Sequence, residues 1–148
     1  MLNPDYSDML SALSAERVEY LVVVALAMAA HGHPRATGGL GIWVKPSREN
    51  ARRVWRALAV FGAPLGDVTE EDFSREGIAF QIGVAPRRID ILTTIDGVTF
   101  AEAWPSKVEV EVEGHRLPVL GRAELLRNKR ASGRPQDLAD AERLLGQP

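Results

Sequence analysis

The histidines His31 and His33 are the first place in the chain where residue type and spacing could do chemistry. Two imidazoles separated by one residue can hold a metal ion, but the sequence shows no third ligand beside them. The C-terminal end of a helix also favours histidine, because the helix dipole stabilises its positive charge. We therefore favour a capping role over a metal site for this pair.

Several familiar catalytic motifs are missing from the sequence. The chain has no cysteine, which excludes disulfides, thiolate catalysis and cysteine metal sites. It has no Gly-x-Gly-x-x-Gly run, no Walker-type Gly-Lys-Ser/Thr and no Gly-x-Ser-x-Gly elbow. Dinucleotide binding through a Rossmann fingerprint, P-loop chemistry and a hydrolase elbow are therefore not indicated.

Gly39 and Gly41 stand at alternating positions where a buried strand begins. Glycine is poor inside strands, because it has no side chain to pack and loses more backbone entropy than other residues. Two interpretations remain open. Either the glycines permit a β-bulge or close backbone packing, or side chains that these positions would carry are absent.

The composition is that of a globular protein with one domain, residues 1–148. The chain has 45% hydrophobic and 26% charged residues, a net charge of −2 and a pI near 5.9. The net charge of −2 does not favour nucleic acid as a partner. The apolar run at residues 20–30 is too short to cross a membrane, and two glutamates precede it, so we expect a cytoplasmic protein without membrane contact.

Hydrophobic periodicity predicts an α+β protein with a mixed sheet and helices against it. Runs of β-branched or alternating residues predict strands at 20–24, 40–44, 78–83, 87–93, 107–113 and 116–120. Helical spacing and capping residues predict helices at 4–13, 25–30, 46–61, 122–131 and 135–145, with a further helix start at 69–72.

Four segments together resemble small bacterial nucleotidyltransferase-fold proteins, relatives of the abortive-infection nucleotidyltransferase toxins. The segments are YLVVVALAMAAHG (20–32), RATGGLGIWV (35–44), RIDILT (88–93) and NKRASGRPQD (128–137). The resemblance extends over residues 18–144. It implies a nucleotidyltransferase-like fold with a mixed sheet flanked by helices and a helical C-terminus.

The resemblance also implies a reaction. Members of this family transfer a nucleotide from an NTP to a hydroxyl acceptor using Mg²⁺. An Asp-x-Asp on the second strand and a third acid on a later strand hold the metal, since residues i and i+2 of a strand share a face. The metal orients the triphosphate and neutralises charge while pyrophosphate leaves.

This sequence departs from the family pattern where the metal should bind. Gly39 and Gly41 stand at the two Asp-x-Asp positions, and Val24 stands where the family has a glycine that lets backbone approach phosphate. Only Asp90 remains, either as a remnant ligand or as a polar residue near a strand end. We therefore expect an inactive or impaired enzyme with no bound Mg²⁺; natural and engineered origins of these departures both remain open.

The resemblance assigns nucleotide contacts to six positions: Val24, Ala25, Arg35, Thr37, Lys129 and Arg134. Lys129 and Arg134 have a second interpretation, in which they pair with Asp137 and Asp140 to hold the last helix. We interpret the arginines of helix 46–61 as a solvated helix face rather than an RNA-binding patch. RNA binding remains an open alternative. The alternative function is a non-catalytic protein-binding module, such as a toxin–antitoxin-like partner or a homodimer.

Overall fold

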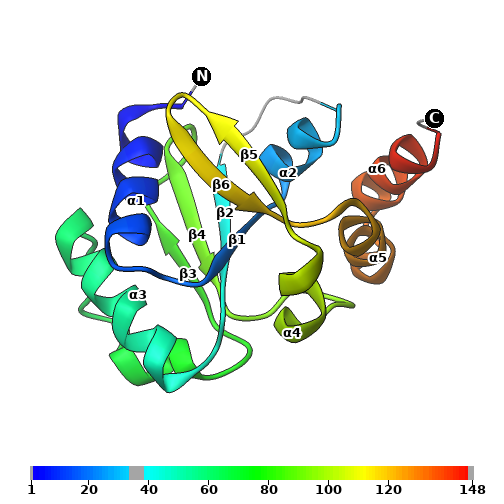
Figure 1. The fold of residues 1–148 in the computed structure, drawn as a ribbon. Helices are drawn as coiled ribbons and strands as arrows, with labels where there is room; N and C mark the ends of the chain where they lie inside the picture. Colours follow the sequence, from blue (N-terminus) through cyan, green and yellow to red (C-terminus); the bar gives the residue numbers. More distant parts are fainter. Residues whose placement is uncertain (1, 34–38, 147–148) are drawn as a thin grey trace.

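A single mixed sheet forms the centre of the molecule (Figure 1). The structure, a computed structural model, describes residues 2–33 and 39–146. The six strands lie in the order β3-β4-β2-β1-β6-β5. Their bounds are β1 (Tyr20–Val23), β2 (Gly39–Val44), β3 (Ala79–Ile82), β4 (Arg88–Leu92), β5 (Val108–Val112) and β6 (His115–Val119).

The strand register brings three segments that are distant in sequence into one row. β2 pairs antiparallel with β1 and parallel with β4. Gly41 is therefore the direct neighbour of Val23 on one side and of Asp90 on the other. Because paired residues share a face of the sheet, Asp90 lies beside one of the two glycine positions, as the resemblance implied.

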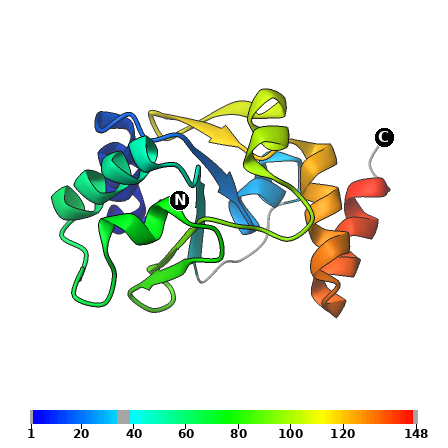
Figure 2. The same cartoon turned by 90° about the horizontal axis from the view of Figure 1, so that it is seen from below.

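Helices cover both sides of the sheet (Figures 1 and 2). The helices α1 (Pro4–Ala15) and α3 (Arg48–Phe61) lie on one side, with the short helix η1 (Glu70–Ser74). On the other side are α2 (Ala25–Ala30), α4 (Phe100–Ala103), η2 (Trp104–Ser106), α5 (Arg122–Ser132) and α6 (Pro135–Leu145). The two sides of the sheet therefore have different partners.

Alternation along the strands separates an apolar face from a face with the site residues. The side chains that alternate with Gly39, Gly41 and Asp90 are almost fully buried: Leu40, Ile42, Ile89 and Ile91. They point toward α1 and α3, because the opposite face shares a pocket with α5. The hydrophobic core is one cluster with members from α1 to α6.

Most element boundaries agree with the sequence analysis within two residues. Ser47 caps α3 by accepting a hydrogen bond from the Asn50 backbone N–H, and Gly62 ends α3 in the left-handed region with φ of 90°. The expectation that Val24 ends the first strand is wrong. Val24 has left the extended conformation and is the N-cap of α2. Within the described part of the chain, no helix combines the length and the apolar character that a membrane crossing needs.

Candidate functional site

The only acid expected to survive in the metal site, Asp90, is engaged by an arginine. The Nε of Arg88 donates hydrogen bonds to both carboxylate oxygens of Asp90, at 3.1 and 3.0 Å. These two residues are i and i+2 on β4, so both project from the face that holds Gly39 and Gly41. The positive charge beside Asp90 is therefore the guanidinium of Arg88, which bonds both Asp90 oxygens.

Val24 fills the space that a side chain at position 41 would need. A Cβ added to Gly41 would lie 2.5 Å from Cγ2 of Val24 and 3.1 Å from Cγ2 of Val23. The first distance is far inside van der Waals contact. An aspartate at position 41 therefore requires that Val24 move or be replaced by a smaller residue.

The backbone of Val24 adopts a conformation that suits glycine. Its φ is 68° and its ψ is −135°, a region that a β-branched residue rarely enters. The family resemblance places a glycine at this position, and the backbone geometry agrees with that. The turn after β1 has a backbone conformation that suits glycine but carries a valine, with 44% of the residue exposed.

Position 39 is also constrained. A Cβ on Gly39 would lie 3.2 Å from the carbonyl oxygen of Arg88 and 3.5 Å from its Cγ. A side chain fits here only after a small shift of the neighbouring strand. The Arg88 side chain is thus the neighbour of both Asp90 and Gly39.

These residues do not fit a Mg²⁺ site of the family type. Magnesium prefers oxygen ligands in octahedral geometry and usually takes one or two carboxylates. Asp90 is the single carboxylate of the row, and Arg88 already bonds both of its oxygens. Among residues 2–33 and 39–146, no three His, Cys, Asp or Glu side chains group closely enough to hold a metal ion.

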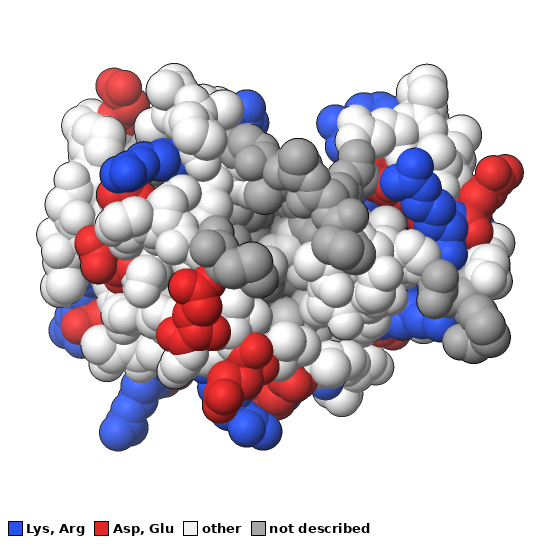
Figure 3. Space-filling model, turned by 90° about the horizontal axis from the view of Figure 1, so that it is seen from above, with Lys and Arg blue, Asp and Glu red and all other residues white. Residues whose placement is uncertain are grey.

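A small pocket of about 200 Å³ joins the end of β1 to the C-terminal helices. Seen from above, the right-hand part of the surface, where α5 and α6 lie in Figure 1, carries both basic and acidic side chains (Figure 3). The pocket is lined by Val23, Val24, Leu92, Thr94, Ile95, Asp96, Asn128, Lys129, Ser132, Arg134 and Asp137. Three of the predicted nucleotide-binding residues, Val24, Lys129 and Arg134, therefore lie around one cavity.

The buried cation in this pocket is already paired. Lys129 is only 5% exposed, and its Nζ lies 3.5 Å from Oδ1 of Asp137 and 3.2 Å from Oδ2 of Asp140. The Nε of Arg134 donates to Oδ2 of Asp137 at 2.6 Å. The structure therefore contains the pairing that the sequence left as the second interpretation for Lys129 and Arg134.

The pKa values of this cluster follow from the same contacts. Burial alone would raise the pKa of Asp137, but the Arg134 hydrogen bond and the charges of Lys129 and Arg134 together hold that pKa below its usual value. The hydrogen bond and charge of Asp137 raise the pKa of Arg134 in turn. Asp137 is thus an ionised carboxylate that forms ion pairs with both Lys129 and Arg134.

The remaining predicted residues are placed as follows. Ala25 begins α2 directly after Val24. Arg35 and Thr37 lie outside the described residues. His31 is held through Nε2, which lies 2.8 Å from the carbonyl oxygen of Leu120. This backbone contact is in keeping with a structural role at the end of α2.

Two features of the site escaped the sequence analysis. The pairing of Arg88 with Asp90 had a signal, because i and i+2 on a strand share a face. By contrast, nothing in the hydrophobic periodicity indicated that Val24 occupies the space of a side chain at position 41. It depends on the turn after β1 folding back toward β2, which only the three-dimensional structure shows.

Comparison with known proteins identifies the fold. No family model matches the sequence, and no curated protein matches it. A crystal structure of a protein from Thermotoga maritima, described as a proposed nucleotidyltransferase, superposes with a TM-score of 0.62 over 98% of this chain and 93% of that chain. The sequence identity is 18%, so the likeness concerns the fold alone. The predicted α+β nucleotidyltransferase-like fold, a mixed sheet flanked by helices with a helical C-terminus, is confirmed.

Proposed function

We propose that this nucleotidyltransferase-fold protein has lost Mg²⁺-dependent nucleotidyl transfer and acts as a non-catalytic binding protein. The observation that carries the proposal is the 2.5 Å distance between Cγ2 of Val24 and the Cβ that any side chain at position 41 would need. The space for the second Asp-x-Asp carboxylate is filled by another side chain. The absence of the second carboxylate and the filling of its space by Val24 thus go together.

The chemistry explains the size of the expected loss. In the family reaction the metal neutralises charge on the triphosphate as the acceptor hydroxyl attacks and pyrophosphate leaves. Without two of the three carboxylates, several kcal/mol of transition-state stabilisation are missing. We expect a rate at least about a thousandfold below that of an intact site.

The phosphate side of the pocket supports the same proposal. Carboxylate partners neutralise part of a cation's charge and take up its hydrogen-bond donors, which leaves less of both for a triphosphate. Lys129 has carboxylate oxygens at 3.2 and 3.5 Å and is almost completely buried. Moving it toward a phosphate would leave Asp140 buried with less compensation, which is unfavourable.

A thermal-melt titration tests the proposal on the unmodified protein. The four nucleoside triphosphates are added with Mg²⁺, with Mn²⁺ and with EDTA. Binding to the folded state alone contributes about 2.7 kcal/mol at a hundred times the dissociation constant. We expect no metal-dependent rise in melting temperature, and such a rise would overturn the proposal. An equal rise with EDTA would identify the binding partner as the nucleotide itself.

A restored variant tests the structural reason. Val24→Gly, Gly39→Asp and Gly41→Asp together remove the filling side chain and return both carboxylates. We expect this variant to bind Mn²⁺ in calorimetry, while the matched Val24→Gly, Gly39→Asn, Gly41→Asn variant does not. If both folded variants fail to bind Mn²⁺, the assignment of these positions to a former metal site is wrong.

A further inference from the structure

Three arginines form a row along the outer face of α3. Arg48, Arg52 and Arg56 follow one another at intervals of four residues, and all three are exposed. Residues i and i+4 lie one above the other on a helix, so the row extends over about 12 Å at a rise of about 1.5 Å per residue. We call these three residues the α3 arginine row.

The guanidinium groups of the row have no acidic partner within the described part of the chain. Among residues 2–33 and 39–146, neither an ion pair nor a hydrogen bond includes the side chain of Arg48, Arg52 or Arg56. Arg53 of the same helix differs, because its Nη2 lies 2.7 Å from Oε1 of Glu49. The charge of Glu49 is thus balanced by Arg53, and the row keeps three unpaired positive charges.

The row borders a concavity of about 400 Å³ that is lined almost entirely by arginine. Its lining contains no apolar residue and consists of Arg48, Glu49, Arg52, Arg53 and Arg56. The acids of η1, Glu70 and Glu71, line a different cavity, together with Ala51. The concavity therefore offers several guanidinium groups to one anionic ligand.

This lining suits phosphate better than it suits another protein. The cores of protein–protein interfaces are apolar and aromatic, whereas protein–DNA interfaces are more polar and much more positively charged. A guanidinium group binds phosphate oxygens through two parallel N–H donors. One strand of B-DNA presents a phosphate about every 3.4 Å along its axis, so a row of about 12 Å can meet about three of them.

We propose that the α3 arginine row binds the phosphate backbone of a nucleic acid. The sequence favoured a solvated face, but it could not show that Arg53 pairs with Glu49 while the row stays unpaired. The net charge of the whole chain is −2, so the attraction is local to α3.

The proposal goes beyond the proposed function and does not depend on it. Helix α3 lies on the other side of the sheet from α5 and α6 (Figures 1 and 2). None of the residues that line the concavity lines the pocket beside Val24 and Lys129. Binding at α3 therefore stands or fails separately from the loss of catalysis.

The salt dependence of binding measures how many phosphates the row contacts. Fluorescence anisotropy is recorded with a labelled duplex of about twenty base pairs, as DNA and as RNA of the same sequence, from about 50 to about 200 mM salt. Three phosphate contacts predict a slope of log K against log salt of about −2.7 on DNA, which is an affinity loss of about 40-fold over this range. Tighter binding of one duplex names it as the partner, and equal binding supports recognition of the shared phosphate backbone.

Single substitutions locate the contacts. Arg52→Gln removes one charge of the row, and Arg130→Gln is the matched control on α5, where Arg130 is also exposed. We expect Arg52→Gln to reduce the magnitude of the slope by about 0.9 and Arg130→Gln to leave it unchanged. Arg48→Gln and Arg56→Gln repeat the test at the other members of the row, and circular dichroism checks the folding of each variant.

Three results would overturn the proposal. The first is no binding of either duplex at the lowest salt concentration. The second is an equal decrease of the slope in Arg52→Gln and Arg130→Gln, which would show attraction by overall charge. The third is tighter binding of labelled polyglutamate of equal charge, which would identify an acidic protein segment as the partner.

Discussion

At the residue scale, Val24 and Gly41 are complementary in size. The γ-methyl group of Val24 lies where a side chain on Gly41 would begin. The valine also holds a backbone conformation with positive φ, which costs on the order of 1–3 kcal/mol. A change at either position therefore has an effect that depends on the other.

We predict that Gly41→Ala destabilises the protein by about 1–3 kcal/mol, because the added Cβ collides with Val24. In the background of Val24→Gly the same change should cost much less, because the colliding methyl group is gone. Urea denaturation of the four proteins in the double-mutant cycle measures the coupling.

Gly66→Ala is the matched control for this cycle. No atom lies within 4 Å of a Cβ added at Gly66, and no positive φ constrains it. We expect its effect to be small and to be the same in the wild-type and Val24→Gly backgrounds. Additive effects at positions 24 and 41 would show that the valine does not fill that space.

The residue scale also shows what could be predicted from the sequence. The resemblance placed Asp90 beside the glycine positions, and the register of Gly41 with Asp90 agrees with it. The φ of Val24 could not be predicted, because a β-branched residue after a β-branched run favours continued strand. The order of the strands, which makes β5 an edge, also needs contacts between distant segments.

At the element scale, buried charges hold α5 against α6. Lys129 comes from α5, whereas Asp137 and Asp140 come from α6, and all three residues are nearly inaccessible to solvent. Buried ions are favourable only when they are paired and hydrogen-bonded. The two helices are thus coupled by a cluster in which removing one charged member leaves another buried charge less well balanced.

We predict that Lys129→Met costs about 3–5 kcal/mol, since it leaves the buried Asp140 carboxylate with a weaker partner. Adding Asp140→Asn should recover part of this loss by removing the carboxylate charge that Lys129 no longer balances. Urea denaturation of the single and double variants measures both changes in the free energy of unfolding. A cost below about 1 kcal/mol for Lys129→Met would contradict a paired, buried lysine.

The loss of protein stability at low pH depends on the same cluster. The pKa of Asp137 is lower in the folded protein than in the unfolded chain, so its contribution is present above about pH 4 and is lost as pH falls through the folded pKa. Arg134→Gln should bring that pKa back toward its usual value. We predict a lower melting temperature than wild type at pH 7 and a smaller difference near pH 2. A difference independent of pH would contradict this ion pair.

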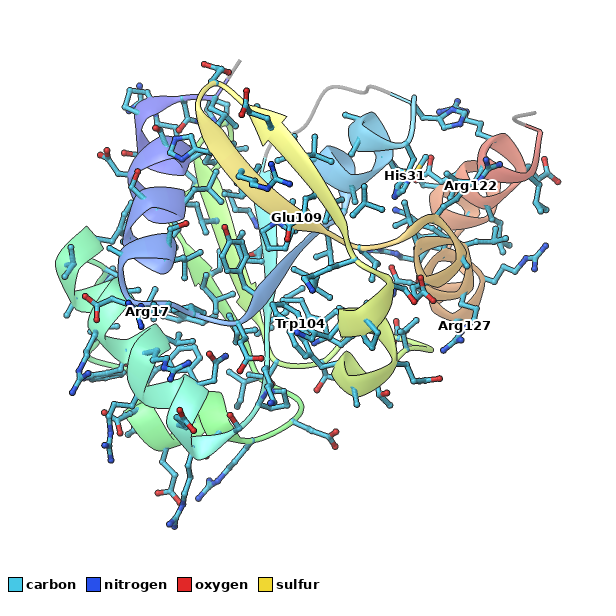
Figure 4. All side chains as sticks on the ribbon, in the orientation of Figure 1. Arg17, His31, Trp104, Glu109, Arg122 and Arg127 are labelled. Atoms are coloured by element: carbon cyan, nitrogen blue, oxygen red, sulfur yellow. The ribbon has the colours of Figure 1, made fainter. Side chains whose placement is uncertain are left out.

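At the scale of the whole molecule, the C-terminal helices belong to the same core as the sheet. Leu144 in α6 is 1% exposed and is a member of the cluster that includes the strand residues. Arg127 of α5, labelled in Figure 4, donates a hydrogen bond from Nη2 to Oε2 of Glu102 in α4 at 3.0 Å. The lobe that borders the pocket is thus connected to the body by apolar packing and by an ion pair.

This connection predicts that the lobe and the sheet unfold together. Leu144→Ala should cost about 2–5 kcal/mol, because it leaves a cavity beneath α6. The three tryptophans, Trp43, Trp55 and Trp104, all lie outside α5 and α6, so their fluorescence reports on the body, while far-ultraviolet circular dichroism includes both helices. We expect both signals to shift to the same lower melting temperature. An early loss of ellipticity before the fluorescence change would show that the lobe unfolds by itself, and the pocket would then lose one wall without any change in the sheet.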